Sequence, residues 1–574
     1  MSETQSAAEI ARQWLADFEG WVVDDGVPRE RVFGDPGWWR DVLALTWDFR
    51  SLSGEGIEEL RKAARGVRFG GLRLGTDVPL HLAAGGTSLM VQFELTSDHG
   101  AGRGIAHLVR TDAGWRAAVL FTQLDEVAGR REAIGADRPH GAHTSTLEPT
   151  WGEQRARAAE FADGEPDVVI VGAGHSGLSL AARLERVGVR ALVVERAARV
   201  GDSWRNRYAS LVLHDPTTYN HLPYLPFPTT WPRFTPKDKM GDWLELYATA
   251  LDLNVWTEAT VRHAELPDAD GRWSVEVSRG DAVRTLRPAH VVVATGLSGN
   301  RPFLPELTGV EEFGGPVQHS SLFRTGAGAA GSRVLVVGSG NSGHDLAQDL
   351  AEHGAEVTLL QRSPSHVVAG DTMLAMTTQL FGEDGPPTEV ADLISWSMPF
   401  SAAGDRQRAV TAAAAATDAA LLDGLRAAGF GLTDGPEGRG MSALFMERNG
   451  GYYIDVGCSR LIVDGTIAVK HGVGIERLEP GMVVFTDGDA RGFDAIWLAT
   501  GFDGIRDTAR DILGPEAVAA AGPVWGLDEE GELRSVWRAS GQPGLWFMGG
   551  NLSYARAGSK YLALQITAEV AGVR

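Results

Sequence analysis

In the middle of the chain, short apolar runs alternate with segments whose apolar positions repeat at helical spacing. Residues 167–171 (DVVIV) form one such run, residues 178–187 continue with a helical period, and residues 191–194 (ALVV) form a second run. Unbroken apolar runs of this length are typical of parallel strands that are buried on both faces. The pattern therefore predicts a strand–helix–strand unit of an α/β domain.

Glycines at a fixed spacing join the first of these strands to its helix. The turn reads Gly172-x-Gly174-x-x-Gly177, and Glu195 stands at the tip of the second strand. Such glycines let backbone N–H groups approach a pyrophosphate at the helix N-terminus, and a carboxylate at that tip accepts hydrogen bonds from an adenosine ribose. The segment predicts a Rossmann-type dinucleotide site. The alternative is a glycine-rich turn in an ordinary α/β unit.

A second unit of the same kind lies further along the chain. Strand 333–337 runs into the turn GSGNSG at 338–343, a helix is expected over 345–353, and strand 356–360 follows. Arg362 stands at its tip, where the first unit has an acid. A carboxylate there would repel a 2′-phosphate, whereas an arginine can bind one with two hydrogen bonds. We therefore expect FAD at the first turn and NADPH rather than NADH at the second; the alternative for Arg362 is a solvated surface charge.

Two apolar strands end in Ala-Thr-Gly, at 294–296 and 499–501, and this ending brings a glycine close to a bound nucleotide. The proline-rich stretch 208–228 is too long for an ordinary connection, so it is either functional or a surface wrap. Residues 406–428, with their alanine run, predict one long helix. A strand over 544–548 and a closing helix near 559–570 are expected to complete the flavin domain.

The N-terminal part shows a different pattern. Helices are expected at 1–20, 35–48 and 58–65, and an antiparallel sheet is expected from strands at 89–95, 104–110 and 115–124. This α+β pattern resembles the cone-shaped nuclear-transport-factor-2-like fold, which other proteins use as an enzyme, a ligand pocket or a dimer surface. We favour a structural or assembly role, which leaves a homodimer open, and interpret His107 as a sheet-face residue.

The resulting division of the chain is a cone-like domain at 1–135, a linker at 136–165, an FAD-binding domain at 166–298 completed by 499–574, and an NADPH-binding domain at 299–498. A length of 574 residues agrees with several domains.

Composition narrows the classes of function. The net charge of −22 argues against a nucleic-acid partner and against an anionic membrane surface. Cys458 is the only cysteine, which excludes the flavin reductases that use paired cysteines and suits a reducing, cytoplasmic setting. No apolar stretch is long enough to predict a membrane span or a signal peptide, and we expect no metal site.

Four signatures together resemble one family. These are the two glycine turns, the paired Ala-Thr-Gly endings, and Phe313-x-Gly315-x-x-x-His319-x-x-x-Phe323. Residues 167–574 resemble the flavin-containing monooxygenases (class B flavoprotein monooxygenases), and most closely their YUCCA-like branch. Baeyer–Villiger relatives usually carry Trp where this chain has Phe323, so that branch is less favoured.

The motifs and the resemblance imply a set of site residues. His214 or Asn220 stands where animal-type members carry a catalytic Asn, and His319 is expected to set the joint between the domains and to contact cofactor. The expected FAD contacts are Gly172, Gly174, His175, Ser176, Gly177, Glu195, Arg196, Ser203, Trp204, Arg205, His214, Val261 and Asn551. The expected NADPH contacts are Ser339, Gly340, Asn341, Ser342 and Arg362.

The resemblance implies that NADPH reduces FAD, and that one oxygen atom of O2 passes through a flavin peroxide to a small organic substrate. N-oxygenation, S-oxygenation and related reactions all fit. Three alternatives remain: an uncoupled NADPH oxidase or flavin reductase, a Baeyer–Villiger oxygenase acting on a ketone, and a flavoprotein kept for assembly or ligand sensing through its cone-like domain.

Overall fold

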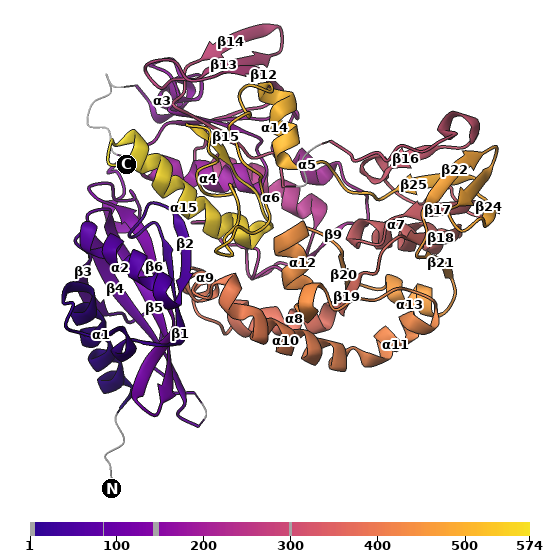
Figure 1. Ribbon diagram of the computed structural model, residues 1–574. Coiled ribbons are helices and arrows are strands. Elements are labelled where there is room, and N and C mark those ends of the chain that lie inside the picture. Colours follow the sequence, from indigo (N-terminus) through magenta and orange to yellow (C-terminus); the bar gives the residue numbers. More distant parts are fainter. Residues whose placement is uncertain (1–5, 84, 142–148, 298–300) are drawn as a thin grey trace.

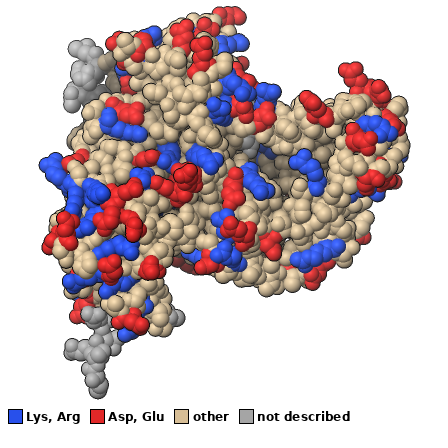
Figure 2. All heavy atoms as spheres, in the orientation of Figure 1, with Lys and Arg blue, Asp and Glu red and all other residues tan. Residues whose placement is uncertain are grey.

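The chain folds as a mixed α/β protein, seen here in a computed structural model that describes residues 6–83, 85–141, 149–297 and 301–574 (Figure 1). An N-terminal sheet lies against one side of a larger body that holds two parallel sheets and a set of helices. No helix in the described ranges is both long and apolar enough to cross a membrane. On the face shown in Figure 2, acidic and basic side chains are interspersed, so the net negative charge forms no single patch there.

The N-terminal sheet has six strands in the order β2-β1-β6-β5-β4-β3, and two helices lie beside it. Its elements are α1 (Ala7–Val23), β1 (Phe33–Val42), β2 (Phe49–Ser53), α2 (Ile57–Gly66), β3 (Gly70–Leu74), β4 (Ser88–Ser97), β5 (Gly100–Thr111) and β6 (Gly114–Val127). Strands β4, β5 and β6 pair antiparallel, as expected, whereas β1 pairs parallel with β6.

The prediction of a helix over residues 35–48 is wrong. Residues 33–42 form β1, which is paired on both sides, and the chain then turns through Leu43 and Trp47, both with positive φ. Trp39 is fully buried and packs its ring against Phe18. Sheet pairing and aromatic packing therefore override the local helical pattern.

Both faces of the N-terminal sheet are apolar. Ala106 and Leu120 face the core that the sheet shares with α1 and α2, while their neighbours Ile105 and Phe121 belong to the core of the larger body. Because side chains alternate along a strand, a strand buried on both faces reads as a continuous apolar run. The sheet thus joins two hydrophobic cores.

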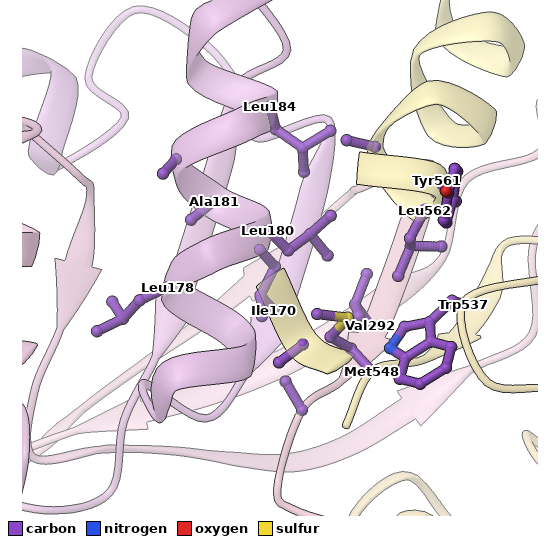
Figure 3. Packing of buried hydrophobic residues seen from close by; sticks show 14 of the residues in the cluster. Ile170, Leu178, Leu180, Ala181, Leu184, Val292, Trp537, Met548, Tyr561 and Leu562 are labelled. Carbon is purple, nitrogen blue, oxygen red and sulfur yellow. The ribbon is translucent and has the colours of Figure 1, made fainter. Parts of the chain in front are cut away.

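The first parallel sheet holds the first glycine turn and has the order β11-β8-β7-β15-β26. Its elements are β7 (Val168–Val171), α4 (His175–Arg186), β8 (Ala191–Val194), α6 (Lys237–Ala250), β11 (Val255–Trp256), β15 (His290–Val293), β26 (Leu545–Phe547) and α15 (Leu552–Val570). Figure 3 shows Leu180 and Leu184 of α4 directed towards Leu562 of α15, beside Val292. Helix α15 begins at Leu552, earlier than the closing helix that the sequence predicts.

Smaller elements surround this sheet. They are α3 (Trp151–Ala159), α5 (Asp202–Arg205), the hairpin β9 (Val212–Pro216) with β10 (Phe234–Pro236), the three-stranded sheet β12 (Ala259–Glu265), β13 (Ser274–Arg279) and β14 (Ala282–Leu286), and α14 (Ile505–Leu513). Helix α3 lies within the stretch predicted as a linker, of which residues 142–148 lie outside the described residues.

The second parallel sheet holds the second glycine turn and has the order β16-β25-β17-β18-β21. Its strands and the helices beside it are β16 (Val317–His319), β17 (Arg333–Val337), α7 (Asn341–Glu352), β18 (Glu356–Gln361), α13 (Cys458–Val463), β21 (Ile467–His471) and β25 (Ala495–Leu498). A separate antiparallel sheet consists of β22 (Ile475–Glu479), β23 (Met482–Phe485) and β24 (Ala490–Gly492).

A helical segment between the second sheet's β18 and α13 runs back towards the N-terminal sheet (Figure 1). Its elements are β19 (His366–Ala369), α8 (Gly370–Phe381), α9 (Thr388–Trp396), α10 (Gly404–Thr417), α11 (Ala419–Ala427), α12 (Gly440–Arg448) and β20 (Tyr452–Asp455). The prediction of one helix over 406–428 is wrong, because it breaks at Asp418. That buried carboxylate accepts hydrogen bonds from Ala369 N (2.8 Å) and Thr372 Oγ1 (2.5 Å), and so holds the start of α8.

Buried ion pairs fasten the N-terminal sheet to the C-terminal segment. Arg40 of β1 donates to both carboxylate oxygens of Glu532, at 2.6 and 2.7 Å, and the two side chains are 9% and 4% exposed. Ser51 Oγ donates to the same carboxylate at 2.6 Å. Tyr561 of α15 also donates to Gln123 Oε1 of β6, at 2.7 Å. The sheet is therefore held by polar contacts as well as by its apolar face.

Replacing Glu532 by Gln should leave the Arg40 guanidinium buried without a counter-charge. We expect the free energy of unfolding to fall by about 3–5 kcal/mol, measured by urea denaturation. The control is Asp98→Asn, which breaks a surface pair whose arginine, Arg68, is 83% exposed; its cost should stay below about 1 kcal/mol. Equal losses in the two variants would contradict the role given to the buried pair.

Candidate functional site

The first glycine turn contains one glycine that the protein itself does not require. A Cβ at Gly172 would lie 2.8 Å from Ala294 O, and one at Gly177 would lie 2.1 Å from Gly172 O, so both positions need glycine for close packing. Gly174 has an ordinary φ of −74°, and a Cβ there meets nothing within 4 Å. The space above Gly174 is open, at the N-terminus of α4, as a ligand site requires.

The second turn repeats this arrangement. A Cβ at Gly338 would lie 2.4 Å from Ala499 O, and one at Gly343 would lie 1.9 Å from Gly338 O. Gly340 has a φ of −85°, and the nearest atom to its Cβ is Tyr452 O at 4.0 Å. Both helices that follow the turns lack an acidic residue in the first turn and a side-chain cap. Their free N–H groups and the helix dipole favour an anion such as a pyrophosphate.

Glu195 fastens the first turn. Its carboxylate accepts hydrogen bonds from Ala173 N and from Ala197 N, each at 2.8 Å. The acid at the strand tip therefore lies beside the glycine turn. Nearby, Thr295 of the first Ala-Thr-Gly ending has a buried Oγ1 without a hydrogen-bond partner in the described parts of the chain. Its counterpart Thr500 in the second ending donates to Phe303 O at 2.5 Å.

Three elements meet at the N-terminus of α15. His175, the first residue of α4, contacts Gly550 O through Nε2 at 3.0 Å. Burial lowers the pKa of His175, so the ring is neutral and Nε2 donates the proton. From the proline-rich stretch, the carbonyl of Tyr219 accepts a hydrogen bond from Arg556 Nη1 at 2.7 Å. Asn551 caps α15 by accepting from Tyr554 N at 2.9 Å.

Asn220 is fully buried beside this junction. Its Nδ2 donates to Asp215 O at 3.0 Å and closes the turn between the two residues. Its Oδ1 is buried and has no hydrogen-bond partner among the residues that the structure describes. Burial raises the pKa of the Asp215 carboxyl to about 6. The sequence interpretation did not single out Asp215, because its burial depends on segments that lie apart in the sequence.

A second junction joins the proline-rich stretch to the second glycine turn. Tyr208 Oη donates to Asp345 Oδ2 of α7, and His214 Nε2 lies 3.8 Å from the same carboxylate oxygen. Burial raises the pKa of Asp345. Arg207, which the sequence interpretation also missed, stacks over the Tyr208 ring at 5.8 Å. His214 thus lies beside α7 of the second glycine-turn unit.

Both ring nitrogens of His319 are held by the protein. Nδ1 accepts from Ser321 N at 3.1 Å, and Nε2 lies 2.8 Å from Gly501 O, so Nε2 carries the proton and donates. Burial lowers the pKa of His319, which keeps it neutral. These bonds link β16 to the second Ala-Thr-Gly ending, as a positioning residue would.

The remaining expected site residues differ in whether their side chains already bind other parts of the protein. Arg362 is exposed at the tip of β18 and forms no ion pair within the described ranges. Asn341 Oδ1 accepts from Ile454 N at 3.0 Å, and Ser339 Oγ lies 2.8 Å from Ser365 Oγ. Arg205 is held by Asp202, Asp242 and Glu245 and has no free donor face comparable to that of Arg362.

For the other expected site residues, the structure gives their location and exposure. The Trp204 ring centroid lies 6.3 Å from that of His175. Val261 is buried in β12, and Ser176 and Ser342 lie in the first turns of α4 and α7. Arg196 and Ser203 are exposed near the first turn.

The similarities of this chain to known proteins agree with the two glycine-turn units described above. The family model described as pyridine nucleotide-disulphide oxidoreductase matches residues 169–374, which include both glycine turns. The probable indole-3-pyruvate monooxygenase YUCCA7 of Arabidopsis thaliana is 33% identical over 342 residues, which cover 58% of this chain and 73% of the relative. The indole-3-pyruvate monooxygenase YUCCA1 of Oryza sativa subsp. japonica is 40% identical over 204 residues, which cover 35% of this chain and 49%, about half, of the relative.

Solved structures show the same fold over about 70% of this chain. A mutant form of a flavin monooxygenase from Stenotrophomonas maltophilia has a TM-score of 0.50 at 22% identity and covers 70% of this chain and 98% of its own. Cyclohexanone monooxygenase has a TM-score of 0.51 at 19% identity, covering 71% of this chain and 88% of its own. OTEMO in complex with FAD and NADP has a TM-score of 0.50 at 19% identity, covering 71% and 85%. Because this chain is 33% identical to the Arabidopsis relative over 342 aligned residues, which cover 73% of that relative, this chain belongs to the flavin-containing monooxygenase family.

Proposed function

We propose that this protein is an NADPH- and FAD-dependent monooxygenase that transfers one oxygen atom of O2 to a small organic substrate. The observation that carries the proposal is the pair of glycine turns, each with a central glycine that faces open space at an uncapped helix N-terminus. Relatives named as indole-3-pyruvate monooxygenases and the OTEMO complex with FAD and NADP support the choice of chemistry and cofactors.

The residues at the first turn fit a dinucleotide. The free N–H groups of α4 suit the pyrophosphate, and Glu195 beside them suits a ribose. Thr295 Oγ1 and Asn220 Oδ1, which have no hydrogen-bond partner among the residues that the structure describes, are available to bond a ligand. Bound FAD would supply the redox chemistry of oxygen transfer, and bound NADPH would supply the electrons.

The residues around the two turns hold this arrangement together. His175 ties the first turn to the N-terminus of α15, and His319 ties β16 to the second Ala-Thr-Gly ending. Tyr208 bridges to Asp345 and so connects the two nucleotide-binding units. We propose His319 and His214 as positioning residues, and Asn220 as a residue that shapes the substrate side of the flavin site.

We propose that each parallel sheet belongs to the domain that binds one of the two cofactors. Residues 166–298, completed by 499–574, would bind FAD, residues 299–498 would bind NADPH, and the N-terminal sheet of residues 1–135 would be a cone-like unit placed beside them. The Ser176, Arg196, Ser203, Trp204, Val261 and Asn551 side chains remain candidates for FAD contacts, and Ser339, Asn341 and Ser342 for NADPH contacts.

Purified protein supplied with FAD should oxidise NADPH in air and oxygenate an organic sulfide. The measurement is the ratio of sulfoxide formed, and of hydrogen peroxide released, to NADPH consumed. Peroxide equal to NADPH with every substrate would favour an uncoupled oxidase. Failure to take up flavin and to oxidise NADPH would overturn the proposal.

Replacing Gly174 by Val should give a folded protein without bound FAD. Valine suits the local backbone angles, and its side chain would occupy the space left for the pyrophosphate. The measurement is the ratio of flavin to protein absorbance, with thermal unfolding as a check on folding. Gly152→Val in α3 is the matched control, since a Cβ there also meets nothing within 4 Å. A variant at position 174 that keeps its full FAD content would contradict the assignment.

Replacing Arg362 by Ala should weaken NADPH use and spare NADH use. Loss of a charged hydrogen-bond partner for the 2′-phosphate should raise the KM for NADPH about tenfold or more, while the KM for NADH, which lacks this phosphate, should change little. Arg460→Ala, at an exposed arginine of α13, serves as the control. Equal changes for the two nucleotides would remove the cofactor assignment.

A further inference from the structure

A large chamber lies between the N-terminal sheet and the helical segment. Its volume is about 640 Å³, and its walls come from β1, β4 and β5 on one side and from α8, α9, α10 and α12 on the other. Figure 1 shows α9 beside the N-terminal sheet, on the side of β2 and β1, and α8 further along the same helical segment. His107 of β5 contacts Ser397 Oγ through Nε2 at 2.7 Å, and this contact holds the sheet against the end of α9.

The chamber reaches the proposed flavin site. Tyr554 and Trp537 form part of its lining, and the Tyr554 backbone N–H donates to the side chain of Asn551, the N-cap of α15. Gly550, one residue earlier, is the partner of His175 in the first glycine turn. The inner end of the chamber and the first glycine turn therefore meet at the same helix N-terminus.

Methionines dominate the apolar lining. Six of the ten methionines of the chain line the chamber: Met90, Met373, Met376, Met398, Met441 and Met446. Their side chains are flexible and polarizable and adapt to ligands of irregular shape. Together with the aromatic rings of Phe49, Trp396 and Phe400, they suit a bulky apolar molecule.

The charged groups of the lining do not favour a cation. Among the described residues of the lining, Glu532 is the only carboxylate, and Arg40 and Ser51 already occupy it. Arg406 also lines the chamber, and no ion pair engages it in the described ranges. Burial lowers the pKa of His107 to about 4, so the ring is uncharged at neutral pH. A buried ammonium group would find no free counter-charge here.

We infer that this chamber is the substrate site, that the N-terminal sheet forms one of its walls, and that it accepts bulky apolar molecules and excludes amine cations. The inference rests on the proposed function and adds a substrate class to it. It also gives the N-terminal sheet a part in substrate selection, where the sequence pattern favours a structural or assembly role.

Three sulfides with the same benzylthio group test the charge preference. Benzyl ethyl sulfide is neutral, (benzylthio)acetate is an anion, and 2-(benzylthio)ethylamine is a cation at neutral pH. Titration calorimetry on the FAD-loaded protein without NADPH measures binding independently of turnover. We expect the cation to bind about tenfold or more weakly than the neutral sulfide. Equal binding of the cation and the neutral sulfide would overturn the stated substrate class.

Substitutions on opposite walls test the position of the site. Met90→Trp in β4 and Met376→Trp in α8 should each weaken binding of benzyl ethyl sulfide about tenfold by filling the chamber. Met482→Trp on β23, a half-buried methionine outside the lining, should bind the sulfide as the parent protein does. Thermal unfolding reports whether each variant is folded. If one of the two wall variants does not fold, the other one still tests whether the chamber binds the sulfide.

Loss of binding in Met376→Trp with parent-like binding in Met90→Trp would overturn the role of the N-terminal sheet. Parent-like binding in both would overturn the chamber as the substrate site. These failures are separate from failure of the proposed function: a parent protein that oxidises NADPH and oxygenates a sulfide, while both wall variants bind that sulfide as the parent does, contradicts only the inference. A parent protein that binds sulfides but never oxidises NADPH contradicts the proposed function.

Discussion

The apolar outer face of the N-terminal sheet constrains the whole molecule. A sheet of this size could cover one face with α1 and α2, but Ile105 and Phe121 point away from those helices into the core of the larger body. Exposed to water, this second face would be a large apolar patch. The C-terminal helix α15 covers it and also packs against α4, so one helix joins the sheet to the first glycine-turn unit within a single core. The N-terminal sheet is thereby an integral layer of the protein.

The same helix brings the chemistry together. Its N-terminus meets the first glycine turn through Gly550, receives the proline-rich stretch through Arg556, and lines the chamber through Tyr554. The proposed cofactor site, the proline-rich stretch and the chamber are thus positioned by one helix. Sites supported by helices and strands keep their geometry better than sites built on loops alone. At the second parallel sheet, the neutral ring of His319 likewise fixes local geometry, because each of its two nitrogens forms a hydrogen bond.

Local patterns predicted the parts of this fold that local physics determines. The strand before each glycine turn, the turn itself and the helix after it follow from apolar runs and glycine spacing, and all of them appear in the structure. Strand β1 could not be predicted in this way, because its parallel pairing with β6 depends on residues far away in the sequence. The break at Asp418 depends on hydrogen bonds to the start of α8. The burial of Asp215 and the methionine-lined chamber could likewise not be predicted, because both form only when distant segments pack together.

Because α15 lies more than 400 residues after the last strand of the N-terminal sheet, the order of synthesis leaves this sheet incomplete for a long time. All six of its strands leave the ribosome before the helix that covers their outer face has been made. Until then Ile105, Phe121 and their neighbours lack their native partners. Cellular yield of this protein should therefore depend on chaperones that shield nascent chains, and a deletion that removes α15 should leave this face of the sheet exposed.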